Sequence, residues 1–275
     1  MTLGPELVLA ESISSDAEVL IVGLTPGDDG PTVAGDAPAA EAITAAVRAL
    51  GAKGKPDEVT KIPAPDGIGV ASVVAVGLGA DPSAEQIRKS AGSAVRALNG
   101  TSVAATTLSA LDLAAAAEGA YLGAYRFTEF KAKSAPTEPP LRRVELLGAD
   151  DAAALQRSAA IAEAVATART FVNTPPSHLF PAEFASRAQA LGEAAGLTVE
   201  VLDETALEAG GYGGILGVGK GSSRLPRLVR LSYTGGGPKV ALVGKGITFD
   251  TGGISIKPAQ NMENMTSDMG GAAAV

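Results

Sequence analysis

The feature that most constrains the fold of this chain is the alternation of apolar runs with helix-forming stretches in its first half. Two of the runs, EVLIVGL (18–24) and VASVVAVGLG (70–79), are apolar almost throughout. Such strands are typical of sheets that helices cover on both faces, because a half-exposed strand alternates apolar and polar residues. The pattern predicts an α/β fold. We expect these elements in the first part: strands at 18–24, 70–79, 102–108 and 142–148, and helices at 39–51, 83–98 and 110–130.

A second α/β domain is expected to follow the first, with the boundary near Asp150, which gives domains 1–150 and 151–275. A linker rich in Pro, Lys and Ser (131–143) precedes the last strand of the first domain. One long helix should run from Asp150 to the pair Pro175–Pro176, since the residue before a proline disfavours helix. The remaining elements expected in this domain are a helix at 181–196 and strands at 197–203, 227–233 and 239–246.

The last residues, MGGAAAV, are expected to begin a helix. We therefore expect the chain to be the first part of a longer protein, whose second sheet is incomplete here.

Composition excludes several classes of chemistry. The chain has no Cys and one His, which excludes disulfides, thiolate zinc sites, a thiol nucleophile and the HExxH metalloprotease motif. With 46% hydrophobic and 19% charged residues, a disordered chain is also excluded. Residues 1–150 hold 12 basic and 19 acidic groups, a net charge of −7, which makes nucleic acid an unlikely partner.

The N-terminus carries Glu6, Glu11 and Asp16 where a signal peptide needs apolar residues. The sequence also lacks an apolar run of the roughly 18 to 20 residues that span a bilayer. We expect a cytoplasmic protein without a membrane segment.

The candidate site is a group of charged residues set among glycines in residues 244–271. It contains Lys245, Asp250, Lys257 and Asp268. Lys245 lies at the end of a predicted strand and Asp250 just beyond it, where α/β folds place ligand sites. Two carboxylates can bind a divalent cation through oxygen, and a lysine amine can join them only when it is deprotonated. The other interpretation is structural: Lys245 and Asp250 would form an ion pair, and Asp268 would cap a helix that begins at Met269.

The string VGKGITFDTGGISIKP followed by SDMGGAAAV resembles, nearly residue for residue, the metal-binding core of the dinuclear leucyl aminopeptidases, the cytosol aminopeptidase family. The similarity extends to EGAYLGAYRFTEFK (118–131), which looks like the family's interdomain helix, and to residues 169–185 and 214–233. The resemblance implies an N-terminal α/β domain similar to macro domains, followed by the first half of an α/β catalytic domain with a central mixed sheet.

The resemblance also implies roles for individual residues. Lys245, Asp250 and Asp268 would bind the more exchangeable of two metal ions, and Asp250 would bridge to the second ion. Lys257 would be catalytic, polarising the scissile carbonyl and stabilising the oxyanion. Met265 would line the pocket for the substrate's N-terminal side chain, although a methionine in this position can equally be a core residue.

The function implied is a two-metal exopeptidase that releases N-terminal residues, leucine preferred, from peptides with a free N-terminus. Its cofactors would be two Mn or Zn ions per subunit, with bicarbonate as a possible base, and its assembly would be a homohexamer. The family's remaining Asp, Glu and Arg lie in an NTDAEGR-type motif, which this sequence does not contain. We therefore expect the chain alone to be inactive. The alternative is a non-catalytic protein that binds a nucleotide or DNA through its N-terminal domain.

Three further signals are set aside. GILGVGKG (214–221) is a near miss to the P-loop pattern, because Gly221 stands where Ser or Thr should hold magnesium. His178 has no second His or Cys to complete a zinc site. The basic group around Arg224, Arg227 and Arg230 is expected to form ion pairs or a subunit contact.

Overall fold

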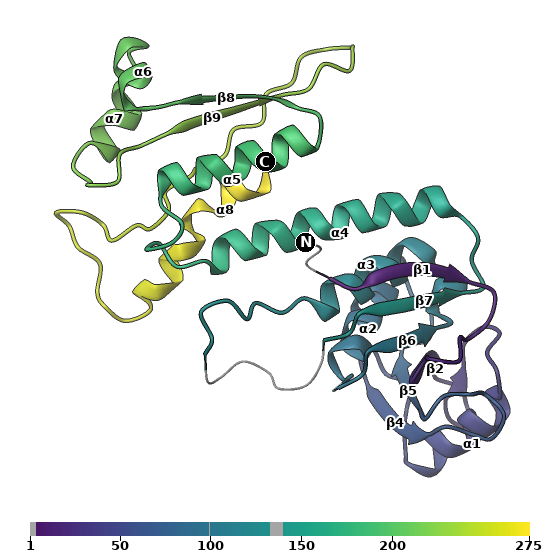
Figure 1. Ribbon diagram of the computed structural model, residues 1–275. Helices are drawn as coiled ribbons and strands as arrows, with labels where there is room; N and C mark the ends of the chain where they lie inside the picture. Colours follow the sequence, from purple (N-terminus) through teal and green to yellow (C-terminus); the bar gives the residue numbers. More distant parts are fainter. Residues whose placement is uncertain (1–3, 99, 133–139) are drawn as a thin grey trace. The chain divides into compact units, whose positions relative to one another are not determined.

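The computed structural model describes residues 4–98, 100–132 and 140–275. The chain divides into two compact units, Met1–Ala166 and Thr167–Val275, with the division inside the long helix α4 (Ala152–Asn173) (Figure 1). The predicted boundary at Asp150 lies just before the start of this helix. Most of the linker predicted at 131–143 lies outside the described residues. Among the helices that the structure describes, none is long and apolar enough to cross a membrane.

The first unit is built on one mixed sheet. Its strand order is β1-β7-β6-β2-β5-β4, with β3 beside β2. The five strands from β1 to β5 in this order run parallel, whereas β4 and β3 are antiparallel to their neighbours. This arrangement confirms the predicted α/β class. The strands are β1 (Glu6–Ala10), β2 (Val19–Thr25), β3 (Thr32–Val33), β4 (Val59–Pro63), β5 (Ser72–Gly77), β6 (Val103–Thr106) and β7 (Arg143–Leu147).

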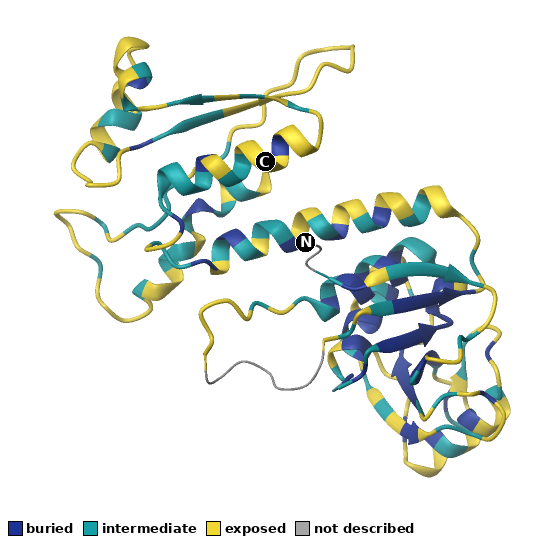
Figure 2. Ribbon diagram, in the orientation of Figure 1, coloured by how far each residue is buried: buried dark blue, intermediate teal, exposed yellow. Residues whose placement is uncertain are grey.

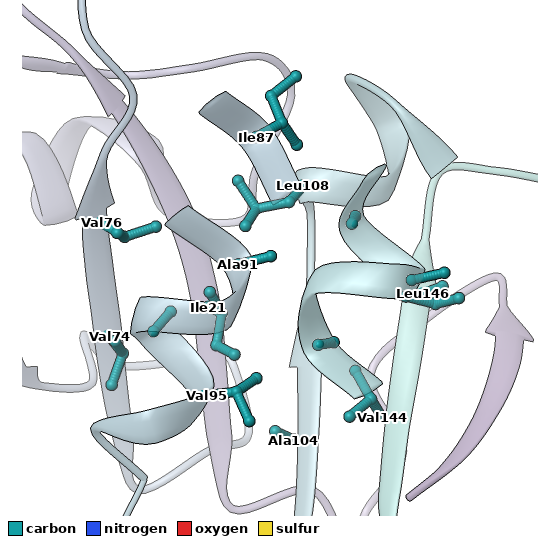
Figure 3. Packing of buried hydrophobic residues seen from close by; sticks show 14 of the residues in the cluster. Ile21, Val74, Val76, Ile87, Ala91, Val95, Ala104, Leu108, Val144 and Leu146 are labelled. Carbon is teal, nitrogen blue, oxygen red and sulfur yellow. The ribbon is translucent and has the colours of Figure 1, made fainter. Parts of the chain in front are cut away.

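Helices cover this sheet on both faces, as the apolar strands predicted. Along β2, Val19 and Ile21 pack into one core with residues of α2 (Ala84–Arg96) and α3 (Leu113–Ala124), which Figure 3 shows in part. The alternating residues Leu20, Val22 and Leu24 pack into a second core with α1 (Ala40–Ala49). Because both faces are covered, β2 is buried almost throughout (Figure 2).

Helices α2 and α3 pack closely through glycines. A Cβ added at Gly119 would lie 2.2 Å from the carbonyl oxygen of Arg88, and one added at Gly123 would lie 2.6 Å from the carbonyl oxygen of Gly92. The two helices are capped by Ser83, which accepts from the backbone N–H of Gln86, and by Asp112. Only residues without side chains fit at this helix contact, so these glycines fix how the two helices cover the sheet.

Several predicted elements of the first unit differ from the structure. Strands β1, β3 and β4 were not predicted, because β1 lies in an acidic stretch, β3 has only two residues and β4 (VTKIP) is short and half polar. The helix predicted at 110–130 is shorter in the structure: α3 begins at Leu113, after the extended N-cap residue Asp112, and ends at Ala124. A separate 3-10 turn, η1 (Leu108–Ala110), precedes it. Residues 118–131 therefore form no interdomain helix; the helix that runs from one unit into the other is α4.

The second unit places helix α5 (Pro181–Ala194) against a two-stranded antiparallel sheet of β8 (Thr198–Leu202) and β9 (Leu228–Ser232). A Cβ at Gly192 of α5 would lie 2.9 Å from the side chains of Val199 and Leu231. Between the two strands, the chain forms two short helices, α6 (Glu204–Ala209) and α7 (Gly213–Gly219). The P-loop-like string is thus largely helical. It does not form a phosphate loop in front of a helix.

The strand predicted at 239–246 is wrong. These residues form no regular secondary structure, and Val240, Leu242 and Val243 are 80%, 73% and 92% exposed (Figure 2). A strand needs a neighbour to pair its N–H and C=O groups, and β8 and β9 pair only with each other in the described residues. The apolar composition is that of a strand, but among the described residues this strand has no partner.

Candidate functional site

Lys245 is placed by a close contact between two backbone segments. Its carbonyl oxygen accepts from the N–H of Ala272, 2.9 Å away, in the first turn of helix α8 (Gly270–Ala274). A Cβ at Gly244 would lie 2.5 Å from the carbonyl oxygen of Gly271. The two glycines therefore let residues 244–245 approach the helix start. This contact brings the Lys245 side chain to the acidic residue that precedes the helix, although the two are 23 positions apart.

Asp268 lies in the 3-10 helix η2 (Met262–Met269), directly before α8. The Nζ of Lys245 is 2.8 Å from its Oδ1 and 2.7 Å from its Oδ2. Only the contact to Oδ1 has hydrogen-bond geometry, so the buried Oδ2 accepts no hydrogen bond. Met269 occupies the N-cap position of α8, and no side chain caps the helix. The interpretation of Asp268 as a helix cap is therefore wrong.

Asp250 is held by a tight loop that ends at Lys257. Its Oδ1 accepts from the N–H of Gly252 at 2.9 Å, and its Oδ2 accepts from Nζ of Lys257 at 2.7 Å. Gly252 has φ +89°, and the N–H of Lys257 donates to the carbonyl oxygen of Thr251. The Lys257 hydrogen bond, followed by that of Gly252, lowers the pKa of Asp250 below its ordinary value. The carboxyl group is therefore ionised at neutral pH.

The four charged residues form one cluster with two ion pairs, Lys245–Asp268 and Lys257–Asp250. The structural interpretation paired Lys245 with Asp250 instead, and the structure does not. The two pairs meet at η2, because Met265 of this helix contacts Lys257 and Asp268 of the same helix pairs with Lys245. Pairing partners depend on the folded loop, so sequence spacing alone could not assign them.

The residues present fit a divalent cation. Asp250 and Asp268 supply carboxylate oxygens, one of them the buried Oδ2 that lacks a hydrogen-bond donor, and both carboxylates already attract a positive charge. Oδ2 lies 2.7 Å from the Lys245 ammonium group, and a divalent cation would bind it directly once that amine is deprotonated. Within the described residues, no three His, Cys, Asp or Glu side chains are grouped to hold a metal, so the set consists of two carboxylates and the amine of Lys245.

Met265 also belongs to this cluster. Its Sδ lies 3.1 Å from Nζ of Lys257, which additionally lies 3.2 Å from the carbonyl oxygen of Asp250. Met265 comes from the same 3-10 helix as Asp268 and is half-buried. Only the family resemblance pointed to this methionine, because its contact with Lys257 has no signal in the residue spacing.

The other polar residues weighed from the sequence lie outside the cluster. His178 lies in the turn between α4 and α5, with Nδ1 3.0 Å from the hydroxyl oxygen of Ser177. In the basic group, Arg227 pairs with Glu204 and Arg230 pairs with Glu200. The guanidinium of Arg224 stacks 4.0 Å from the centre of the Phe180 ring. The expected ion pairs are confirmed for two of the three arginines.

Both units match models of one protein family. Residues 21–134 match the N-terminal domain of the cytosol aminopeptidase family, and residues 166–275 match its catalytic domain. A probable cytosol aminopeptidase of Nocardia farcinica is 63% identical over 291 aligned positions, which cover 100% of this chain and 58% of the relative. One from Mycobacterium tuberculosis is 49% identical and covers 99% of this chain and 59% of the relative. The chain thus spans somewhat more than half the length of these relatives.

Solved structures agree with this match. The bottromycin maturation enzyme BotP in complex with Mn superposes with a TM-score of 0.80 at 35% identity, over 94% of this chain and 54% of that chain. The cytosol aminopeptidase of Coxiella burnetii superposes with a TM-score of 0.73 over 97% of this chain and 55% of that chain; at 24% identity it supports the fold alone.

The fold and the site define an α/β protein with a lysine–carboxylate cluster at the start of a C-terminal helix. The chain belongs to the cytosol aminopeptidase family.

Proposed function

We propose that the protein is a metal-dependent aminopeptidase that removes N-terminal residues from peptides, with leucine preferred. The observation that carries the proposal is the cluster of two carboxylates and two lysines in one loop–helix unit. Its sequence pattern is that of the family to which the chain belongs.

Lys245, Asp250 and Asp268 would hold a divalent cation, with Asp250 as the bridge to a second one. Two such ions activate a water molecule and bind the substrate's amine and carbonyl. The loop from Asp250 to Lys257 fixes the Asp250 carboxylate through the N–H of Gly252, so the orientation of this ligand is set before any cation arrives. Preorganised ligands of this kind lose little conformational entropy on binding.

Lys257 would act on the substrate and not on the metal. Its ammonium group would donate to the scissile carbonyl oxygen and stabilise the negative charge that develops there. The Lys257–Met265 contact supports a shared location for the catalytic amine and the side-chain pocket. A thioether is flexible and apolar, which suits a pocket for leucine-like groups.

We further propose two Mn or Zn ions per subunit, bicarbonate as an additional base, a homohexamer and a cytoplasmic location. The BotP relative is described as a complex with Mn, which supports manganese as the first metal to test. Oxygen-rich sites bind several divalent metals, and their availability often decides occupancy. The described cluster supplies three of the protein ligands, so the 275 residues on their own are expected to bind metal without hydrolysing peptides.

The alternative, a nucleotide- or DNA-binding N-terminal unit, is disfavoured by the structure. In open α/β sheets, ligands bind where the strand order reverses, here beside the carboxyl end of β2. That edge of β2 is occupied by β3, which pairs with Leu24 and Thr25. A Cβ at Gly23 would lie 2.6 Å from the Leu78 side chain and 3.0 Å from that of Leu108. At Gly23 the protein's own leucine side chains therefore leave no room for a ligand.

The test is hydrolysis of leucine p-nitroanilide by the gene product that contains this sequence, with its length fixed by intact mass. We expect activity that depends on Mn²⁺ or Zn²⁺, is lost in Lys257→Ala and is retained in Lys239→Ala, which removes an exposed lysine of the same unit. Metal binding without peptidase activity would overturn the proposal, and salt-sensitive retention of DNA would then favour the alternative.

A further inference from the structure

The ammonium group of Lys257 lies directly beside one carboxylate oxygen of Asp250. Its Nζ is surrounded by three acceptors: Oδ2 of Asp250 at 2.7 Å, the carbonyl oxygen of Asp250 at 3.2 Å and Sδ of Met265 at 3.1 Å. The side chains of Lys257 and Asp250 are 36% and 35% exposed, so solvent reaches the pair but does not separate it. The ammonium group thus fills the coordination space beside this carboxylate.

Both oxygens of Asp250 are engaged in this arrangement. Oδ1 accepts from the N–H of Gly252 and Oδ2 from Lys257. The Gly252 donor is an uncharged backbone N–H, so its hydrogen bond to Oδ1 can persist when a cation binds Asp250. The Lys257 contact brings a full positive charge. A cation that binds through Oδ2 therefore meets this ammonium group first.

A divalent cation and the ammonium group cannot share Oδ2 without strong repulsion. Metal–oxygen distances are about 2.0–2.2 Å, and Nζ lies 2.7 Å from the same oxygen, so the two positive centres would be at most about 5 Å apart. At that distance a double and a single charge repel each other appreciably even in water. Lys257 has a flexible stem with which it can move away.

We propose that Lys257 is an internal placeholder cation: it holds the Asp250 carboxylate and its loop in position while the site is empty, and the incoming metal displaces it. This inference rests on the proposed function, since it concerns the regulation of the same site. Metal loading and release of the catalytic amine become one event. The amine is withheld from substrate, bonded to Asp250, until the metal that activates water is present.

The test is the affinity of the 275-residue chain for Mn²⁺ alone, measured by isothermal titration calorimetry and by electron paramagnetic resonance of free Mn²⁺. Lys257→Met removes the charge while keeping an unbranched stem of similar length. Lys257→Arg keeps the charge, and Lys239→Met removes an equal charge from an exposed position in the same unit. Circular dichroism checks that each variant is folded.

We expect Lys257→Met to bind Mn²⁺ about tenfold more tightly, because the metal then no longer has to break the charge-assisted hydrogen bond that Lys257 donates to Oδ2 of Asp250. Lys257→Arg and Lys239→Met should stay within about threefold of the unmodified chain. Unchanged or weaker binding by Lys257→Met, with the unmodified chain binding Mn²⁺, would overturn the placeholder role and leave the proposed function standing. Failure of every variant to bind Mn²⁺ would overturn both.

Discussion

Replacing Gly252 by Ala tests whether the loop around Asp250 is built to present a metal ligand. Gly252 has φ +89°, and an added Cβ would lie 2.3 Å from the carbonyl oxygen of Ser255 and 3.1 Å from the backbone nitrogen of Lys257. The first distance is far below van der Waals contact. The substitution therefore adds both an unfavourable backbone conformation and a steric clash.

The two effects can be estimated separately. A left-handed conformation costs about 1–2 kcal/mol for a residue with a Cβ, and overpacking costs about 1–3 kcal/mol. The metal-free loop can relax to relieve this sum of about 2–5 kcal/mol, but a metal that recruits Asp250 must restore the original conformation. Because about 1.4 kcal/mol corresponds to a factor of ten, Mn²⁺ affinity should fall at least about 30-fold.

Gly253→Ala is the matched control. Gly253 has φ +66°, but an added Cβ would have no atom within 4 Å. Only the conformational term applies there, so Mn²⁺ affinity should fall about 5- to 30-fold, less than in Gly252→Ala. Calorimetric titration of both variants measures the difference. Binding by folded Gly252→Ala that is within threefold of the unmodified chain would refute the role of the loop.

Three further predictions concern helix packing, a buried hydroxyl group and the pKa of one carboxyl group. Gly119→Ala should lower the free energy of unfolding by about 1–3 kcal/mol, because the added Cβ would clash with α2. In the control Gly217→Ala, in α7, the added Cβ meets no atom within 4 Å, so the free energy of unfolding should rise by up to about 1 kcal/mol. Denaturant unfolding measures both variants, and equal effects would contradict the close packing of α2 and α3. Tyr121→Phe removes a buried hydroxyl that has no hydrogen-bond partner among the described residues, so urea unfolding should show unchanged or slightly higher stability. A loss above about 1 kcal/mol would contradict this expectation. The pKa of Asp16 is lowered chiefly by the hydrogen bond from Ser14 and also by Arg143. The ionised Asp16 carboxylate therefore stabilises the fold above the ordinary carboxyl pKa near 4, and this contribution is lost as pH falls through the lower pKa of the folded state. Ser14→Ala should raise the pKa of Asp16 in an NMR titration, and an unchanged pKa would rule out the hydrogen bond as the cause.

The sequence predicts secondary structure best where the composition of one segment is enough to show how it must be buried. β2 and β5 are apolar almost throughout, which requires cover on both faces and so implies the α/β class. Strands β1 and β4 were missed because they are short and partly polar, and they are held by pairing with β7 and β5. The run 239–246 has strand composition without a partner among the described residues, and composition alone cannot show whether a partner exists.

The candidate site was found from its residue types and its resemblance, but its internal contacts were not. Lys245 meets Asp268 because Gly244 and Gly271 let two backbone segments touch, a tertiary contact that residue spacing does not encode. The hydrogen bonds of Lys257 to Asp250 and Met265 likewise depend on the folded loop. The four charged residues were predictable as a group, and their pairing was not.

The measurement that tests the central claim most directly is titration of the isotope-labelled chain with Mn²⁺, followed by NMR, because the unpaired electrons of Mn²⁺ broaden the signals of nearby amides. We predict that broadening at low Mn²⁺ is concentrated in residues 245–257 and 262–272, and that Asp250→Asn together with Asp268→Asn abolishes it. Broadening centred in the N-terminal unit, or unchanged by this double substitution, would contradict a metal site formed by Lys245, Asp250 and Asp268.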